Sequence, residues 1–388
     1  MTSQNKIKSL FHIDENITFL NHGSFGSCPK PIFKNLQKWQ LLLESQPVDF
    51  LDAKIETRMQ ITRMALSQFI NCDKNDIVLF PNPTTAMNEI IKSLNIKPND
   101  EILTTNHEYG AIDKTWEFIA DKIGAVYKKQ HINSPIISKN NFIDNFFSGL
   151  NKKTKIIFIS HITSPTGLIF PIKEICKIAK EKKIITIVDG AHVPGHIELN
   201  LNKLDVDFYV GACHKWLLCP KGVSFMYVRT KFQKIIKPLI ISWGYKNKDY
   251  KDTPFQNAHL WQGTNDISNY LTIPSAIKFR QNYNWENVCN QSKKIILDFH
   301  NEIYNKINHD PLINDNPKNW LGQMCTFPIN ISIKEIPKMQ KKLREYYKIE
   351  IPIILWNKKV FLRISINGYN NWDDINILLD FLKKENLT

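Results

Sequence analysis

The sequence predicts an α/β fold, in which a large domain with a mostly parallel sheet flanked by helices is followed by a smaller C-terminal α+β domain. Three observations support this prediction. From about Ile77 to Arg229, short apolar runs alternate with longer amphipathic stretches, a pattern typical of strands alternating with helices. After about Tyr270 this pattern changes. The chain of 388 residues is also long enough to bury two hydrophobic cores.

The strands of the large domain are expected where short apolar runs lie between polar segments. Continuous apolar runs of this kind are typical of parallel strands that are covered on both faces. The amphipathic segments between the runs are expected to form the covering helices. In chain order, the expected strands are Ile77–Phe80, Glu101–Thr105, Lys155–Ser160, Ile184–Val188, Phe208–Gly211 and Val223–Val228.

The C-terminal region has a different order of elements. A long amphipathic stretch runs to Ile307, and a loop rich in Asn, Asp and Pro follows it. The order strand, helix, strand, strand, helix comes next, with strands near Cys325–Ile331, Ile349–Ile354 and Val360–Ile364. We therefore expect a large domain over residues 15–265 and a small C-terminal domain over residues 266–388, on which residues 1–14 are expected to pack.

The charge of the chain limits the classes of partner. The 51 basic and 37 acidic side chains leave a formal net charge of +14, which is compatible with a nucleic-acid or anionic-surface partner. The lysines are spread along the chain, however, and there is no arginine-rich arm or nucleic-acid-binding motif. We expect neither a nucleic-acid nor a membrane partner. A non-catalytic basic binding protein on this fold is kept as the alternative from another class.

The cysteines and the N-terminal residues indicate a location. Seven cysteines, an odd number with no Cys-X-X-Cys pair, are typical of reduced thiols in a cytoplasmic protein. The first residues lack the apolar core of a signal peptide, and no run approaches the roughly 18 apolar residues of a membrane span. The sequence therefore predicts a cytoplasmic protein, and it predicts no metal site.

An acidic residue and a lysine follow two of the predicted strands. Asp189 comes directly after Ile184–Val188, and Lys215 comes shortly after Phe208–Gly211. Open α/β sheets bind ligands at these carboxyl ends. A lysine amine can bond covalently to an aldehyde, and an aspartate can keep a pyridine nitrogen protonated, as a pyridoxal phosphate site requires. Taken singly, Asp189 could be a helix cap and Lys215 a solvated side chain.

Further segments extend this pattern over nearly the whole chain. They are Asn21–Gly26, Asn82–Ala86, His107–Gly110, Ser160–Gly167, Gly263–Asp266 and Leu362–Ser365. Together with Asp189 and Lys215, these segments resemble the class-V aminotransferase family of fold-type I enzymes, and within it the isopenicillin N epimerase-like branch. The resemblance implies the fold, the cofactor pyridoxal 5'-phosphate, and catalytic roles for Asp189 and Lys215.

The resemblance also implies a phosphate site before a predicted helix. There the hydroxyls of Thr84 and Thr85 join the free amides of a helix N-terminus, although an ordinary helix cap is the alternative. His214 matches a further phosphate position. Thr264 matches a threonine that the neighbouring subunit supplies in the family, which implies a homodimer with shared active sites. Many relatives have serine where this chain has Ala212, so phosphate binding must depend more on the other residues.

The ring of the cofactor is expected to contact an aromatic side chain and two hydrogen-bond donors. Tyr109 is the expected stacking residue, because a flat aromatic face limits the tilt of the ring, and His107 is the alternative. Ser164 and His192 match positions near the phenolic oxygen of the cofactor in the family. A donor there tunes the reactivity of the cofactor.

The substrate is expected to bind through an arginine. Arg363 lies within the predicted strand Val360–Ile364, where an unpaired charge is costly. A guanidinium binds a carboxylate through two parallel hydrogen bonds, so Arg363 is expected to hold the α-carboxylate of an amino-acid-type substrate. A structural ion pair is the alternative. Asn21 and His22 are expected to form the opposite wall.

In the expected reaction, the amine of an amino acid or amino-acid-derived substrate first displaces Lys215 from the cofactor, and the freed Lys215 then removes the α-proton of the substrate. Three outcomes stay open: epimerisation, which the branch favours; β-elimination, as in C-S lyases of the hercynylcysteine sulfoxide type; and transamination. Cysteine desulfuration needs a nucleophilic cysteine shortly before the carboxylate arginine. Residues 349–363 contain no cysteine, so this reaction is not expected unless Cys325 reaches the site.

Overall fold

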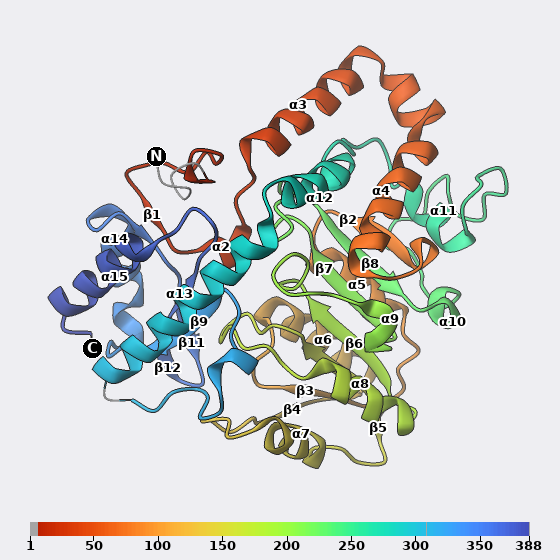
Figure 1. The fold of residues 1–388 in the computed structure, drawn as a ribbon. Helices are drawn as coiled ribbons and strands as arrows, with labels where there is room; N and C mark the ends of the chain where they lie inside the picture. Colours follow the sequence, from red (N-terminus) through yellow and green to blue (C-terminus); the bar gives the residue numbers. More distant parts are fainter. Residues whose placement is uncertain (1–6, 308, 388) are drawn as a thin grey trace.

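A computed structural model describes residues 7–307 and 309–387 and confirms the predicted α/β fold (Figure 1). In this part of the chain a seven-stranded sheet has the order β2-β8-β7-β6-β5-β3-β4. Its strands are β2 (Ile77–Phe80), β3 (Glu101–Thr105), β4 (Val126–Gln130), β5 (Thr154–Ser160), β6 (Ile185–Gly190), β7 (Phe208–Ala212) and β8 (Ser224–Val228).

The sheet is mostly parallel, as predicted. Strands β3 to β7 pair in parallel, whereas β8 runs antiparallel to both of its neighbours, β2 and β7. The six predicted strands are all present; their ends differ by at most one residue, except that β6 ends at Gly190, two residues after the predicted end at Val188. Strand β4 was not predicted, because its residues Val-Tyr-Lys-Lys-Gln lie half-exposed at the edge of the sheet and form no apolar run.

Helices cover both faces of this sheet. Alternate residues of the strands separate two apolar clusters: Val78 and Phe80 pack with α5 and α6 on one face, and Ile77 and Leu79 pack on the other. The helices of this region are η2 (Lys74–Asp76), α5 (Pro83–Ser93), α6 (Gly110–Ile123), α7 (Lys139–Ser148), α8 (Ile172–Glu181), α9 (Leu201–Leu204), α10 (Thr230–Gln233) and α11 (Pro254–Leu260).

The N-terminal helices and the helices after the sheet pack together. Helix α3 extends away from the body at the top of Figure 1, and α4 returns to pack against α12. Helix α13 runs beside the C-terminal elements. The bounds are α2 (His22–Phe25), α3 (Lys30–Ser45), η1 (Asp49–Ala53), α4 (Ile55–Ile70), η3 (Tyr270–Thr272), α12 (Ile273–Asn282) and α13 (Trp285–Lys306).

The C-terminal elements have the predicted order except in one place: the predicted strand Ile349–Ile354 is divided into β10 and β11, which belong to different sheets. Pro352 lies between them and has no N–H to donate to a sheet. A three-stranded antiparallel sheet of order β11-β12-β9 lies at the centre of this region. The N-terminal strand β1 (Thr18–Phe19) pairs in parallel with β10 (Ile349–Glu350), so a segment from the start of the chain packs with the C-terminal elements (Figure 1). The other elements are η4 (Pro317–Asn319), β9 (Met324–Pro328), η5 (Ile333–Glu335), α14 (Ile336–Glu345), β11 (Ile353–Trp356), β12 (Lys359–Ser365) and α15 (Trp372–Lys384).

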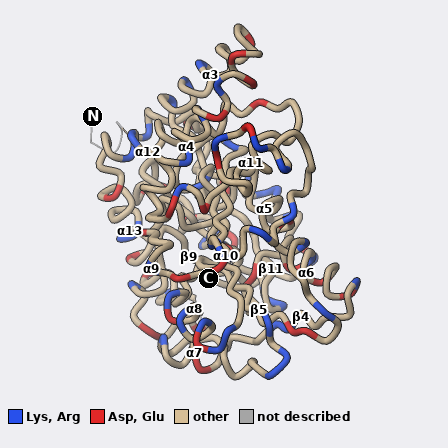
Figure 2. The backbone as a smooth tube through the Cα atoms, turned by 90° about the vertical axis from the view of Figure 1, so that its right-hand side faces the viewer, with Lys and Arg blue, Asp and Glu red and all other residues tan. Residues whose placement is uncertain are grey.

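Charged residues of both signs are interspersed along the chain, as Figure 2 shows for lysine and arginine against aspartate and glutamate. Among the helices of residues 7–307 and 309–387, none is both long and apolar enough to cross a membrane. The same residues contain no group of three or more His, Cys, Asp or Glu side chains placed to hold a metal ion.

Candidate active site

A cavity of about 360 Å³ opens at the carboxyl ends of the parallel strands. Its walls come from segments far apart in the sequence: α2, the N-terminal ends of α5 and α6, the loops after β5, β6 and β7, and strand β12. Eight of the twelve residues predicted for the site line this cavity, namely Thr84, Tyr109, Ser164, Asp189, His192, His214, Lys215 and Arg363. The structure therefore brings most of the predicted site together.

Lys215 lies on the loop after β7, and its Nζ is 3.2 Å from Nε2 of His192. Burial lowers the pKa of Lys215 to about 7; the charge of Arg363 lowers it further, and Asp189 opposes the shift. The backbone of Gly26 packs closely against this loop. Gly26 has a φ of +68°, and a Cβ there would lie 2.2 Å from the carbonyl oxygen of His214. Lys215 therefore has a fixed position and an amine that loses its proton near neutral pH, and the neutral amine is the nucleophilic and basic form.

Asp189 is the second-last residue of β6, is buried, and pairs with Ser160 of β5. Its Oδ1 accepts a hydrogen bond of 2.9 Å from the backbone N–H of Ala191. Burial raises the pKa of Asp189, while that hydrogen bond and the charge of Lys215 lower it. A buried carboxylate stays ionised most readily beside a cation. A protonated pyridine nitrogen in the cavity would supply that cation.

Arg363, on β12, is only 3% exposed and has no carboxylate within 4.0 Å among the described residues. Its Nη1 donates to the carbonyl oxygen and hydroxyl of Ser164, and its Nη2 donates to Ser24 Oγ over 2.9 Å. Its Nε has no partner. Burial lowers the pKa of Arg363 to about 10. The ion pair considered from the sequence is thus not observed, and the positive charge is available to an anionic ligand.

The N-terminus of α5, where the sequence predicts an anion site, lies at the wall of the cavity. Asn82 caps the helix, because its Oδ1 accepts from the N–H and the hydroxyl of Thr85 over 2.8 and 3.0 Å. Thr85 therefore serves the cap, whereas Thr84 lines the cavity, where the first N–H groups of a helix have no partner within it. His214 lines the same cavity and donates from Nδ1 to the carbonyl oxygen of Val223 over 3.0 Å.

The protonation of His214 depends on what binds next to it. Burial lowers the pKa of its imidazole to about 4, and the charge of Lys215 contributes to this shift. A phosphate dianion in contact with Nε2 would favour the charged form and raise that pKa. The residues at this end of the cavity therefore fit a phosphate group better than a neutral ligand.

Three other predicted residues do not line the cavity of their own chain. His22 is completely buried, with Nδ1 2.6 Å from the hydroxyl of Tyr369 and Nε2 3.1 Å from the carbonyl oxygen of Lys215. Asn21 Oδ1 accepts from Ser24 Oγ over 2.5 Å and so reaches Arg363 only through Ser24. Thr264 is exposed in a loop after α11.

Of the two aromatic candidates, only Tyr109 lines the cavity, where it is 44% exposed. His107 is completely buried, its Nδ1 lies 2.9 Å from Thr166 Oγ1, and its ring packs against Trp356 at 4.5 Å between centroids. Cys325 does not reach the cavity either. The neighbouring Thr326 pairs with Arg363 across the sheet, so Cys325 points to the opposite face of β9.

Several residues that line the cavity were not predicted. Ser24 and Phe25 lie within the quoted segment Asn21–Gly26, so the segment was identified but not the side chains that face inward. Ser160 also lines the cavity, and its N–H and hydroxyl donate to Glu108 Oε2 over 2.8 and 2.6 Å. Burial raises the pKa of Glu108 to about 8. Glu108 lies within the motif His107–Gly110, and this motif was the only indication from the sequence that its carboxyl group lies near the site.

A profile of the family described as "Aminotransferase class-V" matches residues 29–378. The chain belongs to the class-V aminotransferase family. Among relatives in this family, it is 27% identical to isopenicillin N epimerase of Streptomyces clavuligerus over 380 residues, which cover 95% of each chain. It is 26% identical over 423 residues to a probable chloroplastic L-cysteine desulfhydrase of Arabidopsis thaliana, covering 97% of this chain and 85% of the relative.

Solved structures share the class-V fold. The apo cysteine desulfurase of Thermococcus onnurineus has a TM-score of 0.82 at 19% identity, covering 99% of this chain and 98% of that one. The cystine C-S lyase C-DES, in complex with its reaction product cysteine persulfide, has a TM-score of 0.80 at 22% identity, covering 95% and 97%. The chain is therefore a fold-type I, pyridoxal-phosphate-dependent enzyme of class V.

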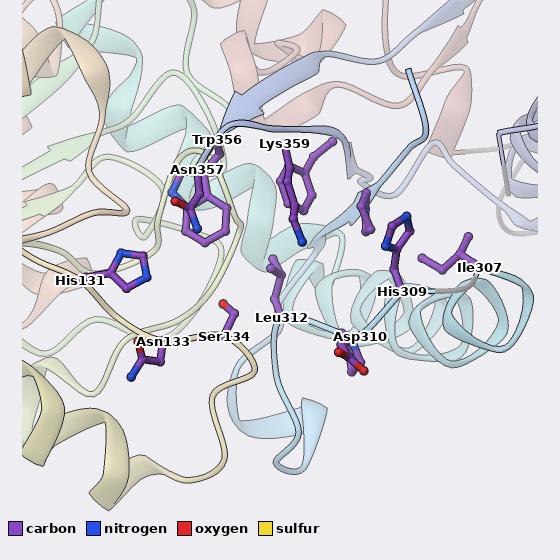
Figure 3. A pocket seen from close by; sticks show the side chains of 13 residues that line it. His131, Asn133, Ser134, Ile307, His309, Asp310, Leu312, Trp356, Asn357 and Lys359 are labelled. Carbon is purple, nitrogen blue, oxygen red and sulfur yellow. The ribbon is translucent and has the colours of Figure 1, made fainter. Parts of the chain in front are cut away.

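A second cavity, of about 520 Å³, lies between the loop after β4, the loop after α13 and the β11–β12 hairpin. Figure 3 shows His131, Ser134, Asp310 and Lys359 around it. No residue predicted for the class-V site lines this cavity. Although this cavity is larger, it is not lined by Lys215, Asp189 or Arg363, so we assign the candidate active site to the smaller cavity.

Proposed function

We propose that this class-V enzyme removes the α-proton of an amino acid or amino-acid-derived substrate. One observation carries the proposal: a buried amine whose pKa is lowered to about 7 faces the same cavity as a buried guanidinium without a carboxylate partner. The amine of Lys215 is the base, and the guanidinium of Arg363 holds the α-carboxylate of the substrate. A proton acceptor and a carboxylate clamp are the two groups that such a reaction requires.

The other residues hold and tune the cofactor. When bound, pyridoxal phosphate withdraws electrons from the substrate Cα and so acidifies its proton. The carboxylate of Asp189 accepts a hydrogen bond from the pyridine N–H and stabilises that charge. Thr84 and His214 bind the phosphate, with Thr85 fixing the helix cap behind them. The ring of Tyr109 packs on the cofactor and limits its tilt.

Ser164 and His192 complete the site as neighbours of the phenolic oxygen. Ser164 also holds Arg363 through its carbonyl oxygen and hydroxyl, so it links the cofactor to the substrate clamp. Asn21 acts through Ser24, and His22 supports the backbone of Lys215 instead of touching the substrate. These contacts fix the geometry in which Lys215 faces Cα.

After the α-proton has been removed, the substrate can react in several ways, and epimerisation is the outcome that we propose first. An isopenicillin N epimerase matches this chain over 95% of both chains. C-S β-elimination is the second, since L-cysteine desulfhydrases match nearly as well. No cysteine of the described residues lines the cavity. A C-S lyase built on this chain would therefore release its sulfur-containing product directly, without transfer to a cysteine of the enzyme. Transamination is a third outcome of the same first step.

We also propose a homodimer in which Thr264 reaches the phosphate of the neighbouring active site. Thr264 is exposed and does not line the cavity of its own chain, which is compatible with such a role. Large apolar side chains are exposed on the projecting α3, just after α3, on α4 and on the segment before α11, in the manner of a subunit interface. They are Leu41, Val48, Ile61, Met64, Leu239, Ile240, Ile241 and Trp243.

The test is α-proton exchange. The enzyme, loaded with cofactor, is incubated with L-amino acids and cysteine conjugates in D₂O, and loss of the α-proton signal is followed by NMR while pyruvate, ammonia and sulfide are assayed. Exchange with inversion would establish epimerisation, and exchange with pyruvate and ammonia would establish β-elimination. Absence of both exchange and products, in a protein that shows the visible band of bound cofactor, would refute the proposal.

A further inference from the structure

Trp216 directly follows Lys215, is 1% exposed, and bonds to a residue of the active site. Its indole Nε1 donates to His192 Nδ1 over 3.4 Å. The other ring nitrogen of His192, Nε2, lies 3.2 Å from Lys215 Nζ. One imidazole therefore connects the buried indole to the catalytic amine through its two nitrogens.

The indole determines which nitrogen of His192 carries the proton. An indole N–H can only donate, so the nitrogen that faces it must be unprotonated. Burial, with the charges of Lys215 and Arg363, lowers the pKa of His192 well below its ordinary value, so the ring is neutral. A neutral imidazole that accepts at Nδ1 has its single proton on Nε2. His192 is thus a donor, and not an acceptor, toward Lys215.

Trp216 is itself held in place from several sides. Its ring stacks on His196 with centroids 4.0 Å apart and planes inclined by 26°. Its carbonyl oxygen accepts from Arg280 Nη1 over 2.9 Å, and Gly195 packs so closely that a Cβ there would lie 2.4 Å from this oxygen. His196 also donates from Nδ1 to the carbonyl oxygen of His192 over 3.0 Å. The indole and the imidazole are therefore fixed relative to each other.

We propose that Trp216 is a positioning residue, which fixes the tautomer of His192 and thereby keeps on Lys215 the proton that this lysine takes from the substrate. The inference rests on the proposed function. In that step the lone pair of Lys215 Nζ bonds to the α-proton, and the electrons of the C–H bond stay with the substrate. Nε2 of His192 already carries a proton and cannot accept this one. The ammonium of Lys215 then gives one of its three hydrogens, the substrate-derived one among them, to a substrate carbon or to the leaving group.

The substitution Trp216→Phe separates this role from packing. Phenylalanine keeps an apolar ring beside His196 but has no N–H, so Nδ1 of His192 becomes free to carry the proton. Nε2 can then accept from the ammonium of Lys215, and the proton is lost to solvent through His192. Trp285→Phe is the matched control, because Trp285 is equally buried and its indole N–H has no partner.

The first measurement is the ¹⁵N NMR spectrum of the cofactor-free protein with labelled histidine, assigned by comparison with His192→Asn. We expect an unprotonated Nδ1 and a protonated Nε2 for His192 in the wild type and in Trp285→Phe. In Trp216→Phe the Nδ1 signal should shift toward the protonated range. A wild-type His192 protonated at Nδ1 would overturn the proposal, even if Trp216→Phe failed to fold.

The second measurement follows the proton itself, with an α-deuterated substrate in ordinary water. The wild type and Trp285→Phe should retain part of the deuterium in the product, and Trp216→Phe should lose it. Equal retention in Trp216→Phe, with its tautomer shifted, would refute the proposed consequence. Absence of any turnover by the wild type would refute the proposed function instead, and the NMR spectrum would still decide the tautomer.

Discussion

Two arginines of this protein are buried to the same degree, 3% exposed, and yet have opposite surroundings. Arg63 on α4 donates from Nη2 to the carboxylate of Asp252, which also accepts from Gln60 over 2.9 Å. Within the described part of the chain, the guanidinium of Arg363 bonds only to oxygens of Ser164 and Ser24. Burying a charge is costly unless an opposite charge compensates for it. Arg63 is compensated within the protein, whereas Arg363 needs an anion from outside.

The buried acids show the same contrast. Glu89 on α5 lies 2.5 Å from His259 Nε2 on α11 and accepts from the backbone N–H of Leu239 over 3.0 Å. Asp189 also accepts a backbone N–H, from Ala191, but within residues 7–307 and 309–387 no basic side chain lies within 4.0 Å of its carboxylate. The two paired groups, Arg63–Asp252 and Glu89–His259, hold the segment that leads to Thr264. Burial alone therefore does not mark an active site here; burial without a compensating charge does.

Lys215→Ala should have the largest effect among substitutions at the candidate active site, where the buried charged groups have no opposite charge within 4.0 Å among the described residues. We expect loss of the visible absorbance of bound cofactor and a fall in turnover of about 10²–10⁴-fold, because the variant lacks both the attachment point and the base. Its free energy of unfolding without cofactor should not decrease, since a buried amine is removed. Lys177→Ala, an exposed position on α8, is the control. An unchanged absorption spectrum would refute the role of Lys215.

Asp252→Asn tests the buried ion pair between Arg63 and Asp252, because it leaves Arg63 buried beside a neutral group. The free energy of unfolding should fall by about 3–5 kcal/mol, the usual cost of breaking a buried ion pair from one side. Denaturant unfolding of the cofactor-free protein measures this change. A loss of less than about 1 kcal/mol would mean that Arg63 does not depend on its partner, and the contrast with Arg363 would lose its basis.

Arg363→Gln should have the reverse effect. We expect no decrease in the free energy of unfolding, and a rise in KM that lowers kcat/KM by about 10- to 100-fold, since hydrogen bonds to charged groups contribute about 1.5–3 kcal/mol. Arg344→Gln removes an exposed arginine on α14 and serves as the control. A loss of stability with an unchanged KM would indicate that Arg363 is structural.

The smallest expected effect is in the pH dependence of the rate at which Lys215 bonds to the cofactor. This rate requires the neutral amine of Lys215, whose pKa is lowered to about 7. The rate should therefore rise with pH, reach half its maximum near pH 7 and level off above it, where an ordinary lysine would still be protonated up to about pH 10.4. Stopped-flow absorbance across this range measures the profile. A rate still rising steeply at pH 9 would contradict the lowered pKa.

Most of the fold could be predicted because the central strands are buried on both faces and form continuous apolar runs. Strand β4 could not, since an exposed edge strand has no such run. The direction of β8 was also beyond prediction, because burial on both faces leaves the same composition in parallel and antiparallel strands.

The site was predictable where a residue follows a strand, as Asp189 and Lys215 do, because parallel strands end at one edge of the sheet. It was less predictable in the short helix α2. There the motif identified the segment, but only the packing against Arg363 shows that Ser24 faces the cavity and His22 does not. The indole bond of Trp216 likewise depends on a fold that brings it against His192.

The contacts of α2 also have a consequence for the timing of synthesis. His22 contacts a carbonyl group 193 positions later in the chain, and Ser24 accepts a hydrogen bond from an arginine 339 positions later. Contacts this distant form late during folding, because their loop must first be closed. On the ribosome, the substrate clamp can be assembled only after β12 has emerged. A nascent chain that has already folded its central sheet would therefore still be unable to bind substrate.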